Sequence, residues 1–307
     1  MTKVLIATDK PFAKEAVQGI KNIFSPTGYD VVFLEKYTNK SDLLSAVADV
    51  DAMIIRSDII DAEVVDAAHH LKIIVRAGAG YDNIDLAACS AKHIVAMNTP
   101  GQNSNAVAEL VIGMMIYKAR NLFNGTSGTE LRGKTLWLHA FGNVAKCVAT
   151  IAKWLGMDIY AFDPFTKASD IEALGVHAVT KVEDLYTTCQ YISLHMPATA
   201  ETKWSVNHSL LSLMPAWATL INTARKEVIN EDELLNIFAE RADFAYLADV
   251  EPDCKAEIIE KYAGRYFFTP NKMGAQTAEA NTNAWLAAAK QIVWFIEQWE
   301  TKFQVNP

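Results

Sequence analysis

A glycine-containing turn and an acidic residue stand 21 positions apart in this sequence. Gly142 lies between an apolar run and a helical pattern, and Asp163 directly follows the next apolar run. In a βαβ unit with this spacing, N–H groups at the helix N-terminus bind a pyrophosphate, and the carboxylate accepts hydrogen bonds from the adenosine ribose. A carboxylate at this position repels a 2′-phosphate, so the pattern favours NAD over NADP.

The glycine motif itself departs from G-x-G-x-x-G. Its six residues read Ala140-Phe141-Gly142-Asn143-Val144-Ala145, so only the central glycine is present. Alanine suits the third position, which needs a small residue for packing of the helix on the strand. Alanine at the first position is strained if a positive φ is required there. By itself, the motif is equally compatible with a dinucleotide site and with a βαβ unit that binds nothing.

Three arginines follow apolar runs and are candidates for binding an anion. Arg225 comes shortly after the run 220–222, and Arg56 and Arg76 come at the ends of two earlier runs. Ligands of open parallel sheets bind at the carboxyl ends of the strands, and a guanidinium can hold a carboxylate or phosphate through two hydrogen bonds. The alternative is that each arginine pairs with an acidic neighbour or has no role.

The elements that must position these residues alternate between strand and helix. Such alternation predicts parallel sheets covered by helices on both faces, an α/β fold. We expect Ser41 and Asp85 to be helix N-caps. In the first hundred residues, the pattern predicts strands at 3–7, 29–34, 52–55, 72–77 and 95–98, and helices at 11–24, 41–47, 61–68 and 85–92.

The rest of the chain continues the alternation after a long helix, 104–122. The polar stretch 124–130 is the best candidate for a linker. The last helix, 275–298, has a surplus of apolar residues, which suggests packing at a domain boundary or a subunit interface. Strands are predicted at 136–140, 158–162, 191–195, 219–222 and 244–249, with a helix at 144–155.

Length and composition limit the classes of function. A chain of 307 residues suggests two domains, and 51% apolar with 21% charged residues is typical of a soluble globular protein. The net charge of −8 argues against nucleic acid or an anionic membrane as a partner. The four cysteines are far apart, without CxxC pairs, so we expect neither disulfides nor a structural metal, and a cytoplasmic location. The short N-terminal apolar run indicates a first strand rather than a signal peptide.

Four further segments, together with the turn around Gly142, resemble the D-2-hydroxyacid dehydrogenase family, and most closely its D-3-phosphoglycerate dehydrogenase branch. The resemblance covers nearly the whole chain, with order and spacing preserved. The segments are 75–85 (VRAGAGYDNID), 98–104 (NTPGQNS) continuing to 108–110 (AEL), 195–197 (HMP) and 220–230 (LINTARKEVIN).

The resemblance implies two Rossmann-like parallel-sheet domains, of which the substrate domain is discontinuous. Residues 1–98 plus 283–307 would bind substrate, residues 99–282 would bind NAD, and the active site would lie in the cleft between them. The implied reaction is NAD-dependent oxidation of D-3-phosphoglycerate to 3-phosphohydroxypyruvate, toward serine. The family comparison also implies a homodimer, formed through the cofactor domain and the helix after Pro100, and no regulatory domain.

The proposed catalytic residues are Arg225, Lys272 and Glu251. In the family, an arginine like Arg225 holds the substrate carboxylate and polarises the reacting oxygen. Lys272 stands where the family usually has a histidine base, and a lysine can replace it if burial beside cations lowers its pKa. The competing interpretations are that Lys272 binds the phosphate or that catalysis has been lost. Glu251 lies in a shortened segment, 249–252, and its role as the partner acid stays open.

The resemblance also implies the binding residues. Another substrate of the family, as in a glyoxylate or hydroxypyruvate reductase, and a non-catalytic dinucleotide-binding homologue remain alternatives. His195 is nearly as well explained as an ordinary side chain at a strand end. The expected cofactor-binding residues are Gly142, Asn143, Val144, Asp163, His195, Pro197, Thr202, Thr223, Ala224, Asp249 and Gly274, and the expected substrate-binding residues are Arg56, Ser57, Arg76, Ala77, Gly78, Ala79 and Asn103.

Overall fold

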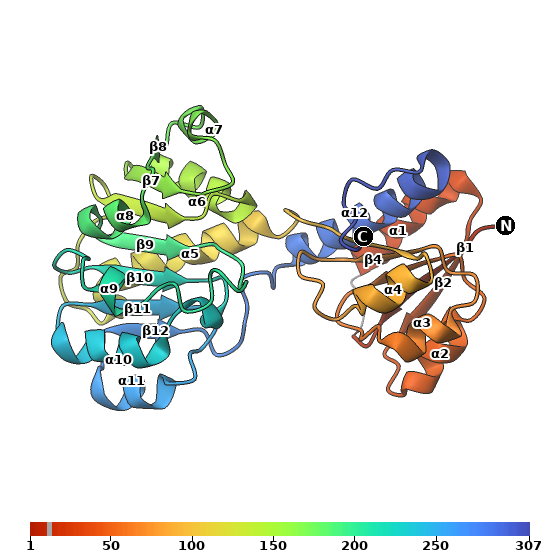
Figure 1. Cartoon of the computed structure of the whole chain (residues 1–307), viewed down its shortest axis with the longest axis horizontal. Helices are drawn as coiled ribbons and strands as arrows, with labels where there is room; N and C mark the ends of the chain where they lie inside the picture. Colours follow the sequence, from red (N-terminus) through yellow and green to blue (C-terminus); the bar gives the residue numbers. More distant parts are fainter. Residues whose placement is uncertain (11–13) are drawn as a thin grey trace. The chain divides into compact units, whose positions relative to one another are not determined.

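Buried apolar runs form two parallel sheets, one in each of the two units into which the chain divides (Figure 1). The computed structural model describes residues 1–10 and 14–307. Unit 1 comprises Met1–Asn103 and Thr277–Pro307, and unit 2 comprises Ser104–Gln276. The predicted fold class, two parallel-sheet α/β domains of which one is discontinuous, is confirmed.

Unit 1 has a five-stranded sheet between two layers of helices. Its strands are β1 (Lys3–Thr8), β2 (Asp30–Glu35), β3 (Ala52–Ile55), β4 (Ile73–Arg76) and β5 (Val95–Asn98), in the order β2-β1-β3-β4-β5. Its helices are α1 (Lys14–Phe24), α2 (Lys40–Val47), α3 (Ala62–Ala67), α4 (Leu86–Ala91) and α12 (Ala278–Gln298), with the short η1 (Ser25–Thr27). Helices α1 and α12 bury apolar side chains against one face, and α2, α3 and α4 against the other.

Unit 2 has a seven-stranded sheet in the order β12-β11-β10-β9-β6-β7-β8. The strands are β6 (Thr135–His139), β7 (Asp158–Phe162), β8 (His177–Ala178), β9 (Tyr191–Leu194), β10 (Thr219–Asn222), β11 (Ala245–Ala248) and β12 (Tyr266–Phe268). The helices are α5 (Ser104–Ala119), η2 (Asn121–Phe123), α6 (Asn143–Trp154), α7 (Ala168–Glu172), α8 (Val182–Thr188), α9 (His208–Leu211), η3 (Lys226–Val228), α10 (Glu231–Glu240) and α11 (Lys255–Lys261). Helices α5 and α6 cover one face, and α8 to α11 cover the other.

Several predictions from local pattern were wrong. The helix predicted at 104–122 ends at Ala119, because the residues of η2 have positive φ values of 50° to 55° and break it. The helix predicted at 275–298 begins at Ala278, because the Thr277 side chain caps it by accepting from the Ala280 N–H. Asp85 caps α4 as predicted, whereas α2 begins at Lys40, before Ser41. The predicted helix start at 11–13 lies outside the described residues.

Two predictions about domain organisation also need correction. The polar stretch 124–130 lies within unit 2, where the Thr129 N–H donates to the Ala119 carbonyl, and it joins no two units. The apolar side chains of α12 pack within unit 1, against α1 and the sheet. Both patterns are ambiguous in a sequence. A polar stretch has the same composition in a loop as in a linker, and a helix that packs in a core has the same apolar residues as one that packs at an interface.

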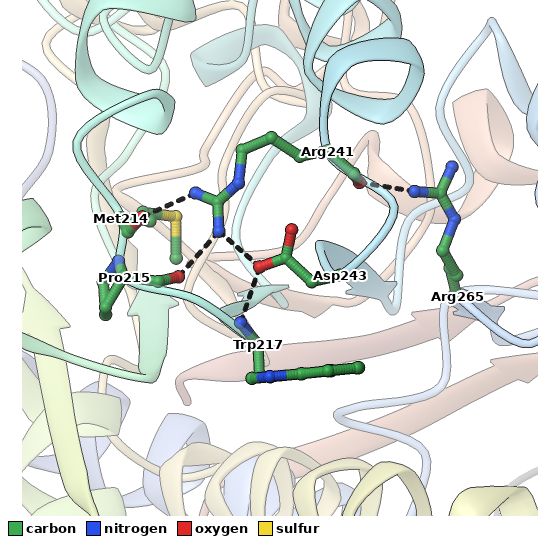
Figure 2. A network of polar contacts seen from close by, with 6 residues as sticks. All are labelled: Met214, Pro215, Trp217, Arg241, Asp243 and Arg265. Carbon is green, nitrogen blue, oxygen red and sulfur yellow. Dashed lines mark hydrogen bonds and ion pairs between the residues drawn. The ribbon is translucent and has the colours of Figure 1, made fainter.

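A charged network joins the loops that precede β10, β11 and β12 (Figure 2). Arg241 donates to two carbonyls of the loop before β10, and to Asp243 Oδ2 at 2.6 Å. The same oxygen accepts from the Trp217 N–H at 2.6 Å, and Arg265 donates to the Arg241 carbonyl. The hydrogen bond from Arg241 lowers the pKa of Asp243. This network stabilises the amino ends of the strands, at the edge opposite to the predicted site.

Among the described residues, no helix combines the length and the apolar character needed to cross a membrane.

Candidate active site

The turn after β6 has the backbone conformation of a dinucleotide-binding turn. Ala140, at the first position of the motif, has a φ of 78°. A left-handed conformation costs a residue with a Cβ roughly 1–2 kcal/mol. The first position therefore does require a positive φ, and this chain accepts the strain of an alanine there.

Gly142 leaves open space at the N-terminus of α6. It is the N-cap residue, and its φ of −78° is accessible to any residue. A Cβ built on Gly142 would meet no atom of residues 1–10 and 14–307 within 4 Å. No side chain of the described residues caps the helix, so the N–H groups of its first turn remain available to an anion. Neither backbone conformation nor packing within the described residues explains the glycine.

The Asp163 carboxylate is fixed beside this turn by backbone donors. Its Oδ2 accepts from the Phe141 N–H at 2.7 Å. Its Oδ1 accepts from the N–H groups of Phe165 at 2.8 Å and Thr166 at 3.1 Å. A carboxylate has about four acceptor positions. The carboxylate therefore keeps acceptor capacity for ribose hydroxyls.

Two histidines lie at the carboxyl ends of the neighbouring strands β6 and β9. The His195 N–H donates to the His139 carbonyl at 2.9 Å, and His139 Nδ1 is 3.1 Å from the Tyr186 hydroxyl. Burial lowers the pKa of His139 to about 4 and that of His195 to about 3. His195 Nε2 is buried and finds no hydrogen-bond partner within the described part of the chain. Both rings are therefore neutral at neutral pH.

The side chain of Thr202, a predicted cofactor-binding residue, closes the loop after His195. Thr202 Oγ1 donates to the Pro197 carbonyl at 2.5 Å and accepts from the Thr199 N–H at 2.8 Å. Its hydroxyl proton is thus used within the protein. In the structure, Thr202 shapes the loop that carries Pro197.

Asn222, which was not predicted as a site residue, holds the turn that carries Arg225. The buried Asn222 side chain accepts from the Ala224 N–H at 2.9 Å and donates to the Arg225 carbonyl at 2.9 Å. The half-buried Arg225 guanidinium donates to the Ala224 carbonyl at 3.1 Å. Thr223 Oγ1 is buried, and no partner for it is found among residues 1–10 and 14–307. An asparagine at a strand end before a turn was the signal in the sequence.

Asp249 holds the segment that carries Lys272. Its Oδ1 accepts from Thr269 Oγ1 at 2.9 Å and from the Met273 N–H at 2.8 Å. Its Oδ2 accepts from the Gly274 N–H at 2.8 Å. Asp249 is 1% exposed, and these donors satisfy its buried oxygens. Lys272 itself lies exposed on the turn that they fix.

Glu251 forms an ion pair with Lys255, four residues later at the start of α11. Both side chains are partly exposed, so the pair contributes little to stability. Glu251 and Lys272 both belong to segments that follow strands of unit 2, β11 and β12.

Arg56 and Arg76 lie at the carboxyl ends of adjacent strands of unit 1. Arg76 ends β4, and its Nε donates to the Arg56 carbonyl at 3.0 Å. The Arg76 side chain lies over Gly78, where a Cβ would be 1.8 Å from Nη1. Arg56 follows β3 and is half-buried, and burial lowers the pKa of its guanidinium. Ser57, beside it, is exposed.

The glycine-rich turn after β4 uses some of the groups that were expected to bind substrate. The Ala77 N–H donates to the Ile55 carbonyl at 2.7 Å, and the Gly78 N–H to the Arg76 carbonyl at 2.8 Å. The Ala79 carbonyl accepts from Asn98 Nδ2 at 2.6 Å. Of the predicted substrate-binding amides, that of Ala79 is the one without such a bond in the described structure.

The remaining predictions concern Asn103 and metals. Asn103 is the last residue of the first segment of unit 1 and is half-buried. Within residues 1–10 and 14–307, no group of three or more histidine, cysteine, aspartate or glutamate side chains could hold a metal ion.

Residues 4–306 match the family model of the D-isomer specific 2-hydroxyacid dehydrogenase catalytic domain. The chain is 32% identical over 311 residues to a D-3-phosphoglycerate dehydrogenase of Methanocaldococcus jannaschii, covering 95% of this chain and 57% of that protein. It is also 32% identical over 311 residues to a hydroxypyruvate reductase of Thermotoga maritima, covering 95% of this chain and 98% of that protein. The chain therefore spans about half the length of curated phosphoglycerate dehydrogenases that it matches, and nearly all of this reductase.

Solved structures show the same fold. A structure of NAD+-bound 3-phosphoglycerate dehydrogenase from Entamoeba histolytica has a TM-score of 0.87 and 47% identity, and the match covers 100% of this chain and 99% of that chain. A structure of D-2-hydroxyisocaproate dehydrogenase has a TM-score of 0.83 at 19% identity, covering 100% of both chains, and at that identity it supports the fold alone.

Proposed function

The chain belongs to the D-isomer specific 2-hydroxyacid dehydrogenase family, and we propose that it oxidises D-3-phosphoglycerate to 3-phosphohydroxypyruvate with NAD, toward serine. The observation that carries the choice of a phosphorylated substrate is the Arg56 guanidinium. It is half-buried, its pKa is lowered by burial, and no acceptor for it is found among the described residues. A cation held partly out of water in this way is stabilised by an anionic ligand.

The turn around Gly142 supports NAD as the cofactor. Open space at Gly142 and the uncapped N-terminus of α6 suit a pyrophosphate. The fixed Asp163 carboxylate suits two ribose hydroxyls and disfavours a 2′-phosphate. The buried Nε2 of His195, without a partner among the described residues, is a hydrogen-bonding atom at the carboxyl end of β9 that a bound cofactor could use.

We assign the chemical roles to residues of this chain as follows. Bound NAD supplies the acceptor for the hydride that leaves substrate C2. Arg225 holds the substrate carboxylate and stabilises the oxygen on C2 as it becomes a carbonyl. Lys272 takes the hydroxyl proton, which it does only as a neutral amine, so the rate should rise with pH. Asn222 and Asp249 fix the turns of these two residues.

In unit 1, the glycine-rich turn and the arginines bind the two anionic groups of the substrate. We assign the phosphate to Arg56 and Arg76, and the carboxylate to the turn at Ala79. Glu251 is engaged with Lys255, so the base does not depend on it in this proposal.

A second function within the family is reduction of hydroxypyruvate or glyoxylate. The observation in its favour is the hydroxypyruvate reductase of Thermotoga maritima, 98% of which this chain covers at 32% identity. A third function, dinucleotide binding without catalysis, is favoured by the strained Ala140 and the exposed Lys272. The ordered Arg225 turn argues against it.

We also propose that two copies of the chain associate through unit 2. Three large apolar side chains near α5 and α6 are exposed: Ile116 at 37%, Phe123 at 66% and Trp154 at 88%. Ile116 and Leu155 line a cavity of about 190 Å³, together with charged residues that include Arg120, Glu130 and Arg132. Large apolar side chains exposed on one unit suit burial in an interface between two copies. Sedimentation should show a dimer that Trp154→Glu weakens, and a wild-type monomer would contradict this.

The test of the substrate is steady-state kinetics of the wild type and Arg56→Met with D-3-phosphoglycerate and D-glycerate. Loss of a charged hydrogen-bonding group to the phosphate should raise the KM for D-3-phosphoglycerate at least about tenfold, with the KM for D-glycerate nearly unchanged. Equal activity of the wild type on both substrates would support the second function instead.

A further inference from the structure

A buried carboxylate, Asp58, connects the ends of three adjacent strands in unit 1. It is 3% exposed. Oδ1 accepts from the Asp9 N–H at 3.1 Å, after β1, and from the Tyr37 hydroxyl at 2.6 Å, after β2. Oδ2 accepts from the Arg56 N–H at 3.1 Å, after β3. These strands are neighbours in the order β2-β1-β3, so one side chain gathers their carboxyl ends.

The backbone of Arg56 is held from a second side as well. Asn83 Nδ2 donates to the Asp58 carbonyl at 2.6 Å and to the Arg56 carbonyl at 3.2 Å. Arg76 Nε donates to the same Arg56 carbonyl at 3.0 Å. The N–H and the carbonyl of Arg56 are thus both fixed, and the side chain of Arg56 extends from an immobilised residue. A cation that is held in place loses less freedom when it binds an anion.

We infer that Asp58 is a positioning residue, which fixes the Arg56 backbone so that the guanidinium is ready for the phosphate of the substrate. This inference rests on the proposed function. Asp58 does not touch the substrate, because it is buried at 3% exposure and a carboxylate repels a phosphate. It acts through Arg56, so its effect should appear in binding of the phosphate and not in the chemical step.

The experiment is steady-state kinetics of Asp58→Asn. An amide can accept from Asp9 and Tyr37 through its oxygen, but its NH₂ group then faces the Arg56 N–H, and the hydrogen bond is lost. The KM for D-3-phosphoglycerate should rise about tenfold, kcat should stay within about threefold, and the KM for D-glycerate should stay within about twofold. An unchanged KM for D-3-phosphoglycerate would overturn the inference.

Asp51→Asn is the matched control. Asp51 also ties strands of unit 1, accepting from the Lys3 N–H at 3.0 Å and from Lys72 Nζ at 3.0 Å, but at their amino ends. The Asp51→Asn variant should have a lower free energy of unfolding, and its KM values for D-3-phosphoglycerate and D-glycerate should be those of the wild type. In the Arg56→Met background, Asp58→Asn should change the KM by less than about twofold, because the two residues act through one group. Additive effects would show a general structural role and overturn the inference.

Two outcomes separate this inference from the proposed function. A wild type without preference for the phosphorylated substrate would overturn both. A wild type with that preference, and an Asp58→Asn variant with the same preference, would overturn the inference alone. If Asp58→Asn does not fold, Tyr37→Phe removes one donor to the carboxylate and should raise the KM for D-3-phosphoglycerate about threefold. An unchanged KM of Tyr37→Phe for D-3-phosphoglycerate would then overturn the inference.

Discussion

Asp249 Oδ2 accepts a hydrogen bond from the Gly274 N–H at 2.8 Å, and a Cβ on Gly274 would lie 2.8 Å from that same oxygen. The backbone of Gly274 therefore approaches the carboxylate more closely than any other residue type allows. This contact fixes the turn on which Lys272 lies. A glycine at position 274 allows this close contact, and the contact holds the turn that carries Lys272, two residues earlier.

Gly274→Ala should therefore impair catalysis. The new methyl group must displace either Asp249 or the turn, and a disturbed hydrogen bond to a buried carboxylate costs about 1–3 kcal/mol. We expect kcat to fall at least about tenfold and the melting temperature to fall with it. Gly113→Ala is the control, because a Cβ on this helical glycine meets nothing within 4 Å. Full activity of Gly274→Ala would show that the turn does not position the base.

Gly142→Ala should weaken cofactor binding without destabilising the fold. Gly142 has a φ of −78°, and a Cβ there meets no atom of the described residues within 4 Å, so the melting temperature should be unchanged or higher. The methyl group would stand where the pyrophosphate approaches the backbone, and the Kd for NAD should rise at least about tenfold. Calorimetric titration measures this. A variant that binds NAD as the wild type does would place the cofactor elsewhere.

The stability of the protein should depend on pH through His139. Burial lowers the pKa of His139 from its ordinary value of 6.5 to about 4. Between these values the unfolded chain binds more protons than the folded one, so the contribution of His139 is complete above about pH 6.5 and is lost as the pH falls toward about 4. The free energy of unfolding should decrease by up to about 1.4 kcal/mol per pH unit for this proton.

The His139→Gln variant checks this prediction. Its free energy of unfolding, measured in urea, should fall less steeply than that of the wild type over this pH interval. His70→Gln, at an exposed position, is the control for the substitution itself. Parallel curves for the wild type and His139→Gln would contradict a neutral, buried His139. The lowered pKa of His195 adds to the wild-type slope in the same direction.

The sequence predicts those parts of the site that depend on local order. The apolar runs before Arg56, Arg76 and Arg225 predicted strands that the structure confirms. A short apolar run bounded by turn residues is a recognisable pattern of a buried strand. The distance between Gly142 and Asp163 reflects one turn, one helix and one strand, so it too is visible in the sequence.

The supporting contacts could not be predicted, because they join residues that are distant in sequence. Asp58 meets Asp9 from 49 positions away, and Asp249 meets Gly274 from 25 positions away. Nothing in the local pattern distinguishes either aspartate from one exposed to solvent. For the same reason, the sequence did not indicate that Ala77 and Gly78 use their N–H groups within the protein.

The most direct test of catalysis by Lys272 is NADH formation from D-3-phosphoglycerate by the wild type and by Lys272→Ala, from about pH 7 to about pH 10. We predict wild-type turnover that rises with pH, and a loss of at least about 100-fold in kcat for the variant, with its Kd for NAD unchanged. Turnover of Lys272→Ala within about threefold of the wild type would contradict the assignment of Lys272 as the base.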